Sequence, residues 1–106
     1  MRPQWGEVWW CDTVTAGRRP CVVLSRNAAI SRLDKVLVVP ATTTVRGLES
    51  EVELDPDHDA VPRWCVLNLD TPEVLPRSAF SERVGSLSFD RMQQVCRALA
   101  AAVDCR

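Results

Sequence analysis

Two short stretches of the sequence carry the side chains best suited to chemistry on an anion. Arg18 and Arg19 directly precede an apolar run that begins at Pro20, and the threonines 42–44 directly follow a second apolar run, with Arg46 two residues further on. A guanidinium is charged at any working pH and binds phosphate oxygens in a fork, and a threonine hydroxyl can donate to an oxyanion. If the two runs are neighbouring strands, these groups meet at one end of a sheet and can stabilise charge that develops on a phosphorus centre.

Both stretches also have ordinary structural explanations. The paired arginines are equally compatible with solvent-exposed charges at the start of a strand. Threonine runs are common in strands because of their β propensity and their hydrogen bonds at strand edges. The residues alone leave both interpretations open.

The cysteines and the single histidine form no pattern typical of a metal site. The five cysteines, at positions 11, 21, 65, 96 and 105, form no C-x-x-C pair, and four of them lie inside apolar patterns that predict small core residues. His58 lies in the polar segment DPDHDAVP and is predicted to be a surface loop residue. We therefore expect no metal, no other cofactor and no disulfide framework.

Length and composition predict one globular domain over residues 1–106 with a single hydrophobic core. Of the 106 residues, 46% are hydrophobic and 25% are charged, which is ordinary for a folded domain. No apolar stretch approaches the length of a membrane span, and the N-terminus lacks the apolar region of a signal peptide. The expected location is the cytoplasm, away from membranes.

The charge is unevenly distributed along the chain. The net charge is −1, but six acids occupy every second position from 49 to 59. Outside that segment the chain has 13 basic and 8 acidic residues, and all but one of the basic residues are arginine. An anionic partner is therefore compatible with the rest of the surface, because the planar arginine fork suits phosphate and base stacking.

The elements that must position these residues are predominantly strands. Strands are expected over residues 5–11, 20–25, 34–44, 50–55 and 64–75, and residues 26–32 can form one helical turn. Pro20 is expected to be the first residue of its strand, where a missing N–H is tolerated. In 50–55, Val52 and Leu54 alternate with acids that form a solvated face. The run 64–75 supplies one or two strands, interrupted by Pro72.

A C-terminal helix is expected after Ser88, which is a good N-cap, with Asp90 in the first turn. Apolar residues then recur at spacings of three and four: Phe89, Met92, Val95, Cys96, Leu99, Ala102 and Val103. The pattern predicts an amphipathic helix of about fifteen residues, packed on a small barrel or a strongly bent sheet.

Five motifs, in one order along the chain, resemble the MazF/PemK family of bacterial toxin endoribonucleases. They are WGEVWWCD, GRRPCVVLS, VVPATTTVRGLESEVEL, VLNLDT and RVGSLSFDRMQQVCRAL. Each motif is short, but their shared order over most of the chain makes the resemblance specific.

The resemblance implies an SH3-like small β-barrel with a C-terminal helix, as in the CcdB/PemK plasmid maintenance toxins, working as a homodimer. It implies a toxin of a type II toxin–antitoxin system that inhibits translation and growth until its antitoxin neutralises it. Such toxins cut single-stranded RNA selectively and without a metal, leaving 2′,3′-cyclic phosphate and 5′-hydroxyl ends. The basic surface suggests a cognate antitoxin whose acidic, disordered tail occupies the RNA groove.

Carried onto this sequence, the catalytic pair of the family is Arg19 and Thr42. RNA supplies its own nucleophile, the 2′-hydroxyl, so these side chains would orient the linkage and stabilise the charged transition state. The general base is not identified, because the high pKa of arginine makes it a poor proton acceptor. The further RNA-contact candidates are Arg18, Thr43, Arg46, Asp70 and Thr71. For the charged members of this set, a solvated or salt-bridged structural role is equally open.

The sequence departs from the family pattern at two places. The connection TVTAGR between the first two strands is shorter than in many relatives and lacks their Ser-Glu-Gln segment, and Thr71 stands where glutamine is common. The contacts with RNA beside the cleaved bond and the choice of base are therefore expected to differ from those of the family.

Two alternatives belong to other functional classes. One is a non-catalytic toxin of the same fold that resembles the gyrase-inhibiting CcdB toxins, which act through the last helix and typically a tryptophan there. This chain ends in AAVDCR, without an aromatic residue. The other alternative is a catalytically silent interaction domain.

Overall fold

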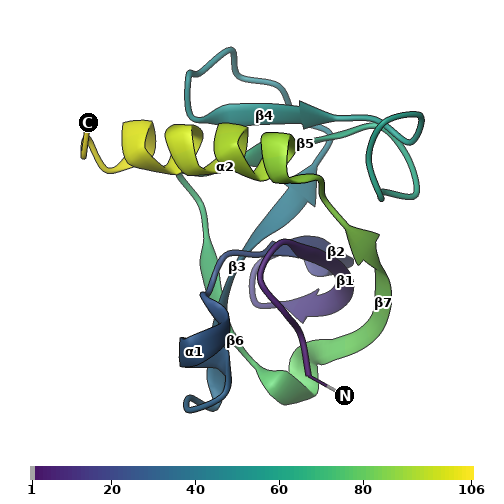
Figure 1. Cartoon of the computed structure of the whole chain (residues 1–106). Coiled ribbons are helices and arrows are strands. Elements are labelled where there is room, and N and C mark those ends of the chain that lie inside the picture. Colours follow the sequence, from purple (N-terminus) through teal and green to yellow (C-terminus); the bar gives the residue numbers. More distant parts are fainter. Residues whose placement is uncertain (1) are drawn as a thin grey trace.

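The computed structural model describes residues 2–106, in which seven strands precede a long C-terminal helix (Figure 1). The strands are β1 (Glu7–Thr13), β2 (Gly17–Val23), β3 (Lys35–Thr42), β4 (Glu51–Leu54), β5 (Cys65–Asn68), β6 (Glu73–Pro76) and β7 (Phe80–Ser86). The helices are α1 (Asn27–Ile30) and α2 (Phe89–Ala102), and a short 3₁₀ turn spans Arg77–Ala79. The prediction of a mainly β fold with a C-terminal helix is confirmed. None of the helices in this part of the chain is long and apolar enough to cross a membrane.

The strands form one antiparallel sheet in the order β4-β5-β3-β2-β1-β7, with β6 also paired to β3. Strand β3 organises the sheet, because β2 pairs with it through Val38–Pro40 while two strands share its other edge. Along that edge β6 pairs with Lys35–Val38 and β5 pairs with Ala41 and Thr42. The edge partner therefore changes around Pro40. Within residues 2–106, β4 and β7 end the sheet without pairing with each other, so the barrel-like sheet stays open.

Buried side chains lie on both faces of this bent sheet. One cluster includes Val8, Leu67 and Met92 of α2, and the other includes Trp9 and Leu75. We expected a single core, and the structure divides it into two. The reason is the alternation of strand side chains, which sends neighbours such as Val8 and Trp9 to opposite faces.

The starts of the first two strands differ from the prediction. Strand β1 begins at Glu7 instead of Trp5, because Gly6 forms a turn with φ +81°. Strand β2 begins at Gly17, so Pro20 lies inside the strand opposite Trp10 and is not its first residue. Proline is tolerated there because the pairing of β2 with β3 begins only at Cys21.

The other predicted elements agree with the structure, except that one strand was not predicted. Strands β3 and β4 lie within the ranges 34–44 and 50–55, the run 64–75 contains β5 and most of β6, and α1 is the expected single turn. Strand β7 was missed. Its sequence FSERVGS includes no fully buried residue, and its pairing with β1 shifts register twice, so no apolar alternation marks it.

Helix α2 begins as predicted and lies alongside β4 (Figure 1). The Ser88 hydroxyl oxygen accepts a hydrogen bond from the Arg91 N–H at 3.1 Å, which confirms the N-cap. The interior residues Met92, Val95 and Ala98 are buried.

Three residues of the expected apolar face, Phe89, Cys96 and Val103, are exposed, so that part of the prediction is wrong. Phe89 and Val103 lie at the two ends of the helix, and Cys96 is rotated about 100° from Val95 around the helix axis. The three cysteines on strands are buried as expected, whereas Cys96 and Cys105 are not.

Candidate active site

Strands β2 and β3 bring the two chemically interesting stretches together. Their register pairs Cys21 with Pro40 and Val22 with Val39. Continued by two residues, the same register places Arg19 opposite Thr42, and residues directly opposite each other lie on the same face of a sheet. The Arg19 Nη1 donates a hydrogen bond to the Ala41 carbonyl oxygen at 2.9 Å. The guanidinium and the hydroxyl therefore converge at one end of this strand pair.

The Arg19 guanidinium retains unused hydrogen-bonding capacity. Its Nε is buried and has no partner among residues 2–106. Within the same part of the chain, Arg19 forms no ion pair with a carboxylate. A buried donor left unpaired costs about 1–3 kcal/mol. Arg19 is thus a cation held in place by the Ala41 carbonyl, with no carboxylate in this part of the chain to neutralise its charge.

The Thr42 hydroxyl is oriented by the backbone two residues further along the chain. Its Oγ1 accepts a hydrogen bond from the Thr44 N–H at 3.1 Å. The hydroxyl accepts in this contact and donates in no hydrogen bond within residues 2–106, so its hydrogen is available for donation. Thr42 can therefore donate to an oxyanion beside Arg19.

Two pockets flank this pair and share Arg19, Thr42 and Thr44. The first, called here the arginine pocket, has a volume of about 230 Å³ and also includes Trp10, Arg18, Thr43, Pro62, Arg63 and Cys65. The second, called here the polar pocket, has a volume of about 220 Å³ and also includes Thr15, Pro40, Arg46, Asn68, Thr71 and Glu73. A ligand that spans both pockets must pass over Arg19 and Thr42.

The arginine pocket combines positive charge with an aromatic wall. Three arginines and no carboxylate line it. The guanidinium carbon of Arg18 lies 4.5 Å from the centroid of the Trp10 ring, which is a cation–π contact. The pairing of Arg18 with Glu82 is long, at 4.0 Å, and exposed, so it neutralises little of this charge. Backbone phosphates and stacked bases of a nucleic acid are the ligands such a surface suits.

Burial keeps the Cys65 thiol of this pocket neutral. Desolvation, with a smaller contribution from the charge of Asp59, raises the pKa of the Cys65 thiol to about 11. Cys65 is therefore a protonated thiol at neutral pH and is not a nucleophile there.

The polar pocket lies where β5 ends and β6 begins, next to Pro40. Glu73, the first residue of β6, accepts hydrogen bonds from the Val14 N–H at 2.9 Å and from the Thr15 hydroxyl at 3.0 Å. The Thr71 hydroxyl donates to the Asn68 carbonyl oxygen at 3.2 Å. The pocket wall is therefore tied to the short connection between β1 and β2.

The structure places most of the predicted RNA-contact residues on these pockets. Arg18 and Thr43 line the arginine pocket, and Arg46 and Thr71 line the polar pocket. Asp70 lines neither. Its Oδ2 accepts a 2.5 Å hydrogen bond from the Ser50 hydroxyl, so Asp70 fastens the turn after β5 to the start of β4.

Sequence reasoning missed several residues of both pockets, among them Trp10, Arg63, Asn68 and Glu73. Trp10 could have been predicted. With β2 starting at Gly17, its pairing with β1 places Trp10 opposite Pro20. No local pattern identifies Glu73, since its place in the pocket depends on how β6 pairs with β3.

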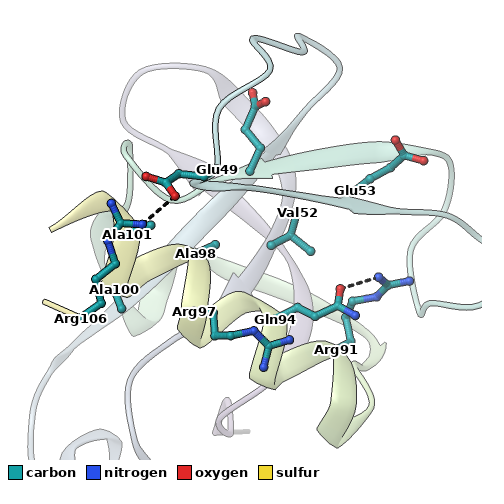
Figure 2. A pocket seen from close by; sticks show the side chains of 11 residues that line it. Glu49, Val52, Glu53, Arg91, Gln94, Arg97, Ala98, Ala100, Ala101 and Arg106 are labelled. Atoms are coloured by element: carbon teal, nitrogen blue, oxygen red, sulfur yellow. Dashed lines mark hydrogen bonds and ion pairs between the residues drawn. The ribbon is translucent and has the colours of Figure 1, made fainter. Parts of the chain in front are cut away.

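A cavity of about 570 Å³, larger than either of these pockets, lies elsewhere, between α2 and β4 (Figure 2). Three glutamates and three arginines line it, so their formal charges cancel. Figure 2 shows the 2.6 Å ion pair of Glu49 with Arg106, which lowers the pKa of the Glu49 carboxyl. The cavity contains none of the predicted site residues, and an anion has more reason to bind at the arginine and polar pockets.

The acidic alternation and the histidine have structural roles. Glu53 is exposed, as expected of a solvated face, while the Glu51 carboxylate accepts the backbone N–H groups of Arg46 and Leu48, which lower its pKa. His58 is an exposed loop residue whose Nδ1 lies 2.9 Å from an Asp55 oxygen. No group of three or more histidine, cysteine or acidic side chains is placed to hold a metal ion within residues 2–106.

The chain is similar to known proteins over nearly its whole length. Residues 4–103 match the sequence model of the family described as PemK-like, MazF-like toxin of type II toxin-antitoxin system. Probable endoribonuclease MazF5 of Mycobacterium tuberculosis is 52% identical over 103 residues, which cover 97% of this chain and 94% of the relative. Probable endoribonuclease MazF2 of the same species is 42% identical over 100 residues, covering 94% and 97%.

Solved structures agree with the sequence relatives. An endoribonuclease from a mycobacterial species, solved in complex with its cognate antitoxin, superposes with a TM-score of 0.87 at 27% identity, covering 98% of this chain and 97% of that one. A MazE–MazF structure from Deinococcus radiodurans has a TM-score of 0.78 at 27% identity, covering 97% and 96%.

Proposed function

Because this chain belongs to the family of PemK-like, MazF-like toxins of type II toxin–antitoxin systems, we propose that it is a sequence-selective endoribonuclease that cleaves single-stranded RNA without a metal. One observation carries the assignment of the site. Arg19, a cation with no carboxylate partner among residues 2–106, converges with the Thr42 hydroxyl between a pocket lined by three arginines and a second, polar pocket.

The proposed reaction is an internal transesterification. The RNA 2′-hydroxyl oxygen attacks the adjacent phosphorus, the bond from phosphorus to the 5′-oxygen breaks, and a 2′,3′-cyclic phosphate and a 5′-hydroxyl result. The proton lost by the 2′-hydroxyl balances the proton gained by the 5′-oxygen. Arg19 and Thr42 donate to the non-bridging oxygens, whose negative charge is greatest in the transition state, so these hydrogen bonds lower the barrier. Arginine is a poor proton acceptor, so Arg19 is not assigned as the base.

The two pockets supply the binding of the flanking nucleotides. Arg18 and Thr43 contact RNA on one side of the scissile phosphate, and Arg46 and Thr71 contact it on the other. Holding the linkage at two points favours the in-line geometry that the attack requires. Asp70 is left out of this scheme, because its carboxylate is engaged by Ser50.

The biological setting is part of the proposal. The protein acts as a single-domain toxin, forms a homodimer, works in the cytoplasm without a cofactor, and inhibits translation and growth until a cognate antitoxin binds it. A relative solved with its cognate antitoxin supports the last point. An acidic, disordered antitoxin tail suits the arginine pocket, since carboxylates mimic phosphate charge.

The decisive experiment is incubation with a long single-stranded RNA in EDTA, followed by mapping of the new ends. Discrete cuts that carry 2′,3′-cyclic phosphates are expected, and saturating antitoxin should abolish them. Absence of cuts at micromolar protein, or cuts that require added magnesium, would contradict the proposal. A gyrase supercoiling assay tests the CcdB-like alternative, which the endoribonuclease relatives do not support.

A further inference from the structure

We propose that Glu73 reads a nucleobase in the polar pocket and selects bases that carry an amino group over uracil at one position beside the scissile phosphate. The inference rests on the proposed function and deepens it. Glu73 begins β6 opposite Val38, is half-buried, and lines the same pocket as Arg19 and Thr42. It is the only acidic side chain on the wall of that pocket within residues 2–106.

The carboxylate of Glu73 retains acceptor capacity after its internal bonds are made. A carboxylate has about four acceptor sites on its two oxygens. The Val14 N–H occupies one site on Oε1, and the Thr15 hydroxyl occupies one on Oε2. One site on each oxygen is therefore left for a ligand.

The neighbouring hydroxyls also present acceptors. Thr15 donates its only hydroxyl hydrogen to Glu73, and Thr71 donates its own to the Asn68 carbonyl. What these two side chains can still offer a ligand is oxygen lone pairs. The pocket wall formed by Thr15, Thr71 and Glu73 is thus acceptor-rich and complements the donor edge of a base.

Base chemistry then gives the direction of the selectivity. Cytosine and adenine carry an exocyclic amino group, and guanine offers an N–H and an amino group side by side. Uracil presents two carbonyl oxygens around one N–H, and these oxygens would face the carboxylate. Because a well-formed contact to a base edge discriminates by about 10-fold or more, uracil should be disfavoured to that extent.

Glu73 also holds the β1–β2 connection through its hydrogen bonds to Val14 and Thr15, so the test must distinguish base recognition from this structural role. Glu73→Gln keeps an amide oxygen for the Val14 N–H, and its amide nitrogen can donate to the Thr15 oxygen, so the connection stays tied. The same change replaces an acceptor by a donor in the pocket. Thr13→Val is the matched control, because it removes two hydrogen bonds of the same connection, one to the Gly17 carbonyl and one from the Ala16 N–H, and Thr13 lines neither pocket.

The experiment is cut-site sequencing on a pool of single-stranded RNAs with randomised positions, comparing the wild type with Glu73→Gln and Thr13→Val. The wild type should deplete uridine about 10-fold at one position next to the cut. Glu73→Gln should abolish that depletion while the preferences at other positions stay unchanged, and Thr13→Val should keep the wild-type profile.

Two results would overturn the inference and leave the proposed function standing. One is a Glu73→Gln enzyme that cuts all sequences more slowly but with unchanged base preferences. Glu73 would then only hold the β1–β2 connection in place. The other is a wild-type enzyme that accepts uridine freely at every position next to the cut. A wild type that cuts no RNA would refute the proposed function, and this inference with it.

Discussion

Replacement of Arg19 by methionine should separate activity from stability. Methionine has a similar length and is apolar, so it removes the charge and the donors without opening a large cavity. We expect cleavage to fall by about 10²–10³-fold, which is the typical loss when one preorganised donor to a transition-state oxyanion is removed.

The effect on folding should be small because two contributions oppose each other. The variant loses the Arg19 hydrogen bond to the Ala41 carbonyl, and a hydrogen bond involving a charged group contributes about 1.5–3 kcal/mol. It also removes the buried unpaired Nε, which costs the wild type about 1–3 kcal/mol. The free energy of unfolding should therefore stay within about 2 kcal/mol of the wild type.

The assay is single-turnover cleavage of a short fluorogenic RNA, run beside urea denaturation of the same preparations. Arg32→Met is the matched control, because Arg32 is exposed and lines neither the arginine nor the polar pocket. A screened surface charge of this kind should change the rate by no more than about twofold. The reasoning fails if Arg19→Met retains cleavage within tenfold of the wild type, or if it unfolds while Arg32→Met remains folded.

Three further predictions concern the hydroxyl, the helix anchor and the thiols. Thr42→Val should lower single-turnover cleavage about 100-fold while Thr42→Ser retains most of it, and equal losses in the two variants would show that the hydroxyl is not the active group. Asp59→Ala should lower the free energy of unfolding by about 3 kcal/mol, because Arg91 of α2 loses its two hydrogen bonds to a buried carboxylate. Urea denaturation measures this change, and an unchanged midpoint of the urea transition would contradict it. At pH 7.5, brief treatment with iodoacetamide should modify the two exposed cysteines and spare the three buried ones, including Cys65 with its raised pKa, and mass spectrometry showing more than two adducts would refute the burial.

The parts of the site that could be predicted are those that local sequence positions by itself. Arg19 and Thr42 each lie against a continuous apolar run, and such a run has few structural options besides a buried strand. Once both runs are strands in adjacent positions of a sheet, the register brings the two side chains to one face. The helix cap at Ser88 was predictable for a similar reason, because its hydrogen bond spans three residues.

The parts that could not be predicted depend on contacts between distant segments. Glu73 reaches the pocket because it bonds to Val14 and Thr15, which are 59 and 58 residues away in sequence. Strand β7 carries no alternation because it follows β1 through two irregularities of register. Phe89 fits the apolar spacing of α2, but it is the first residue of the helix and lies beyond the part that packs on the sheet, so it is exposed. Periodicity shows which face of a helix is apolar, and only packing shows how much of that face is buried.

Pro20 explains why the sheet ends in an open, charged site instead of a continued ladder. Continuing the register of β2 and β3 by one residue places Pro20 opposite Ala41, and proline has no N–H to donate. The Ala41 carbonyl accepts instead from the Arg19 side chain, so the guanidinium takes the place of a backbone donor at the strand end. One donor of Arg19 is thereby fixed to the scaffold, and its remaining donors stay beside the Thr42 hydroxyl. The fold thus positions its cation through a missing backbone hydrogen bond, which requires no further charged partner that would compete with phosphate.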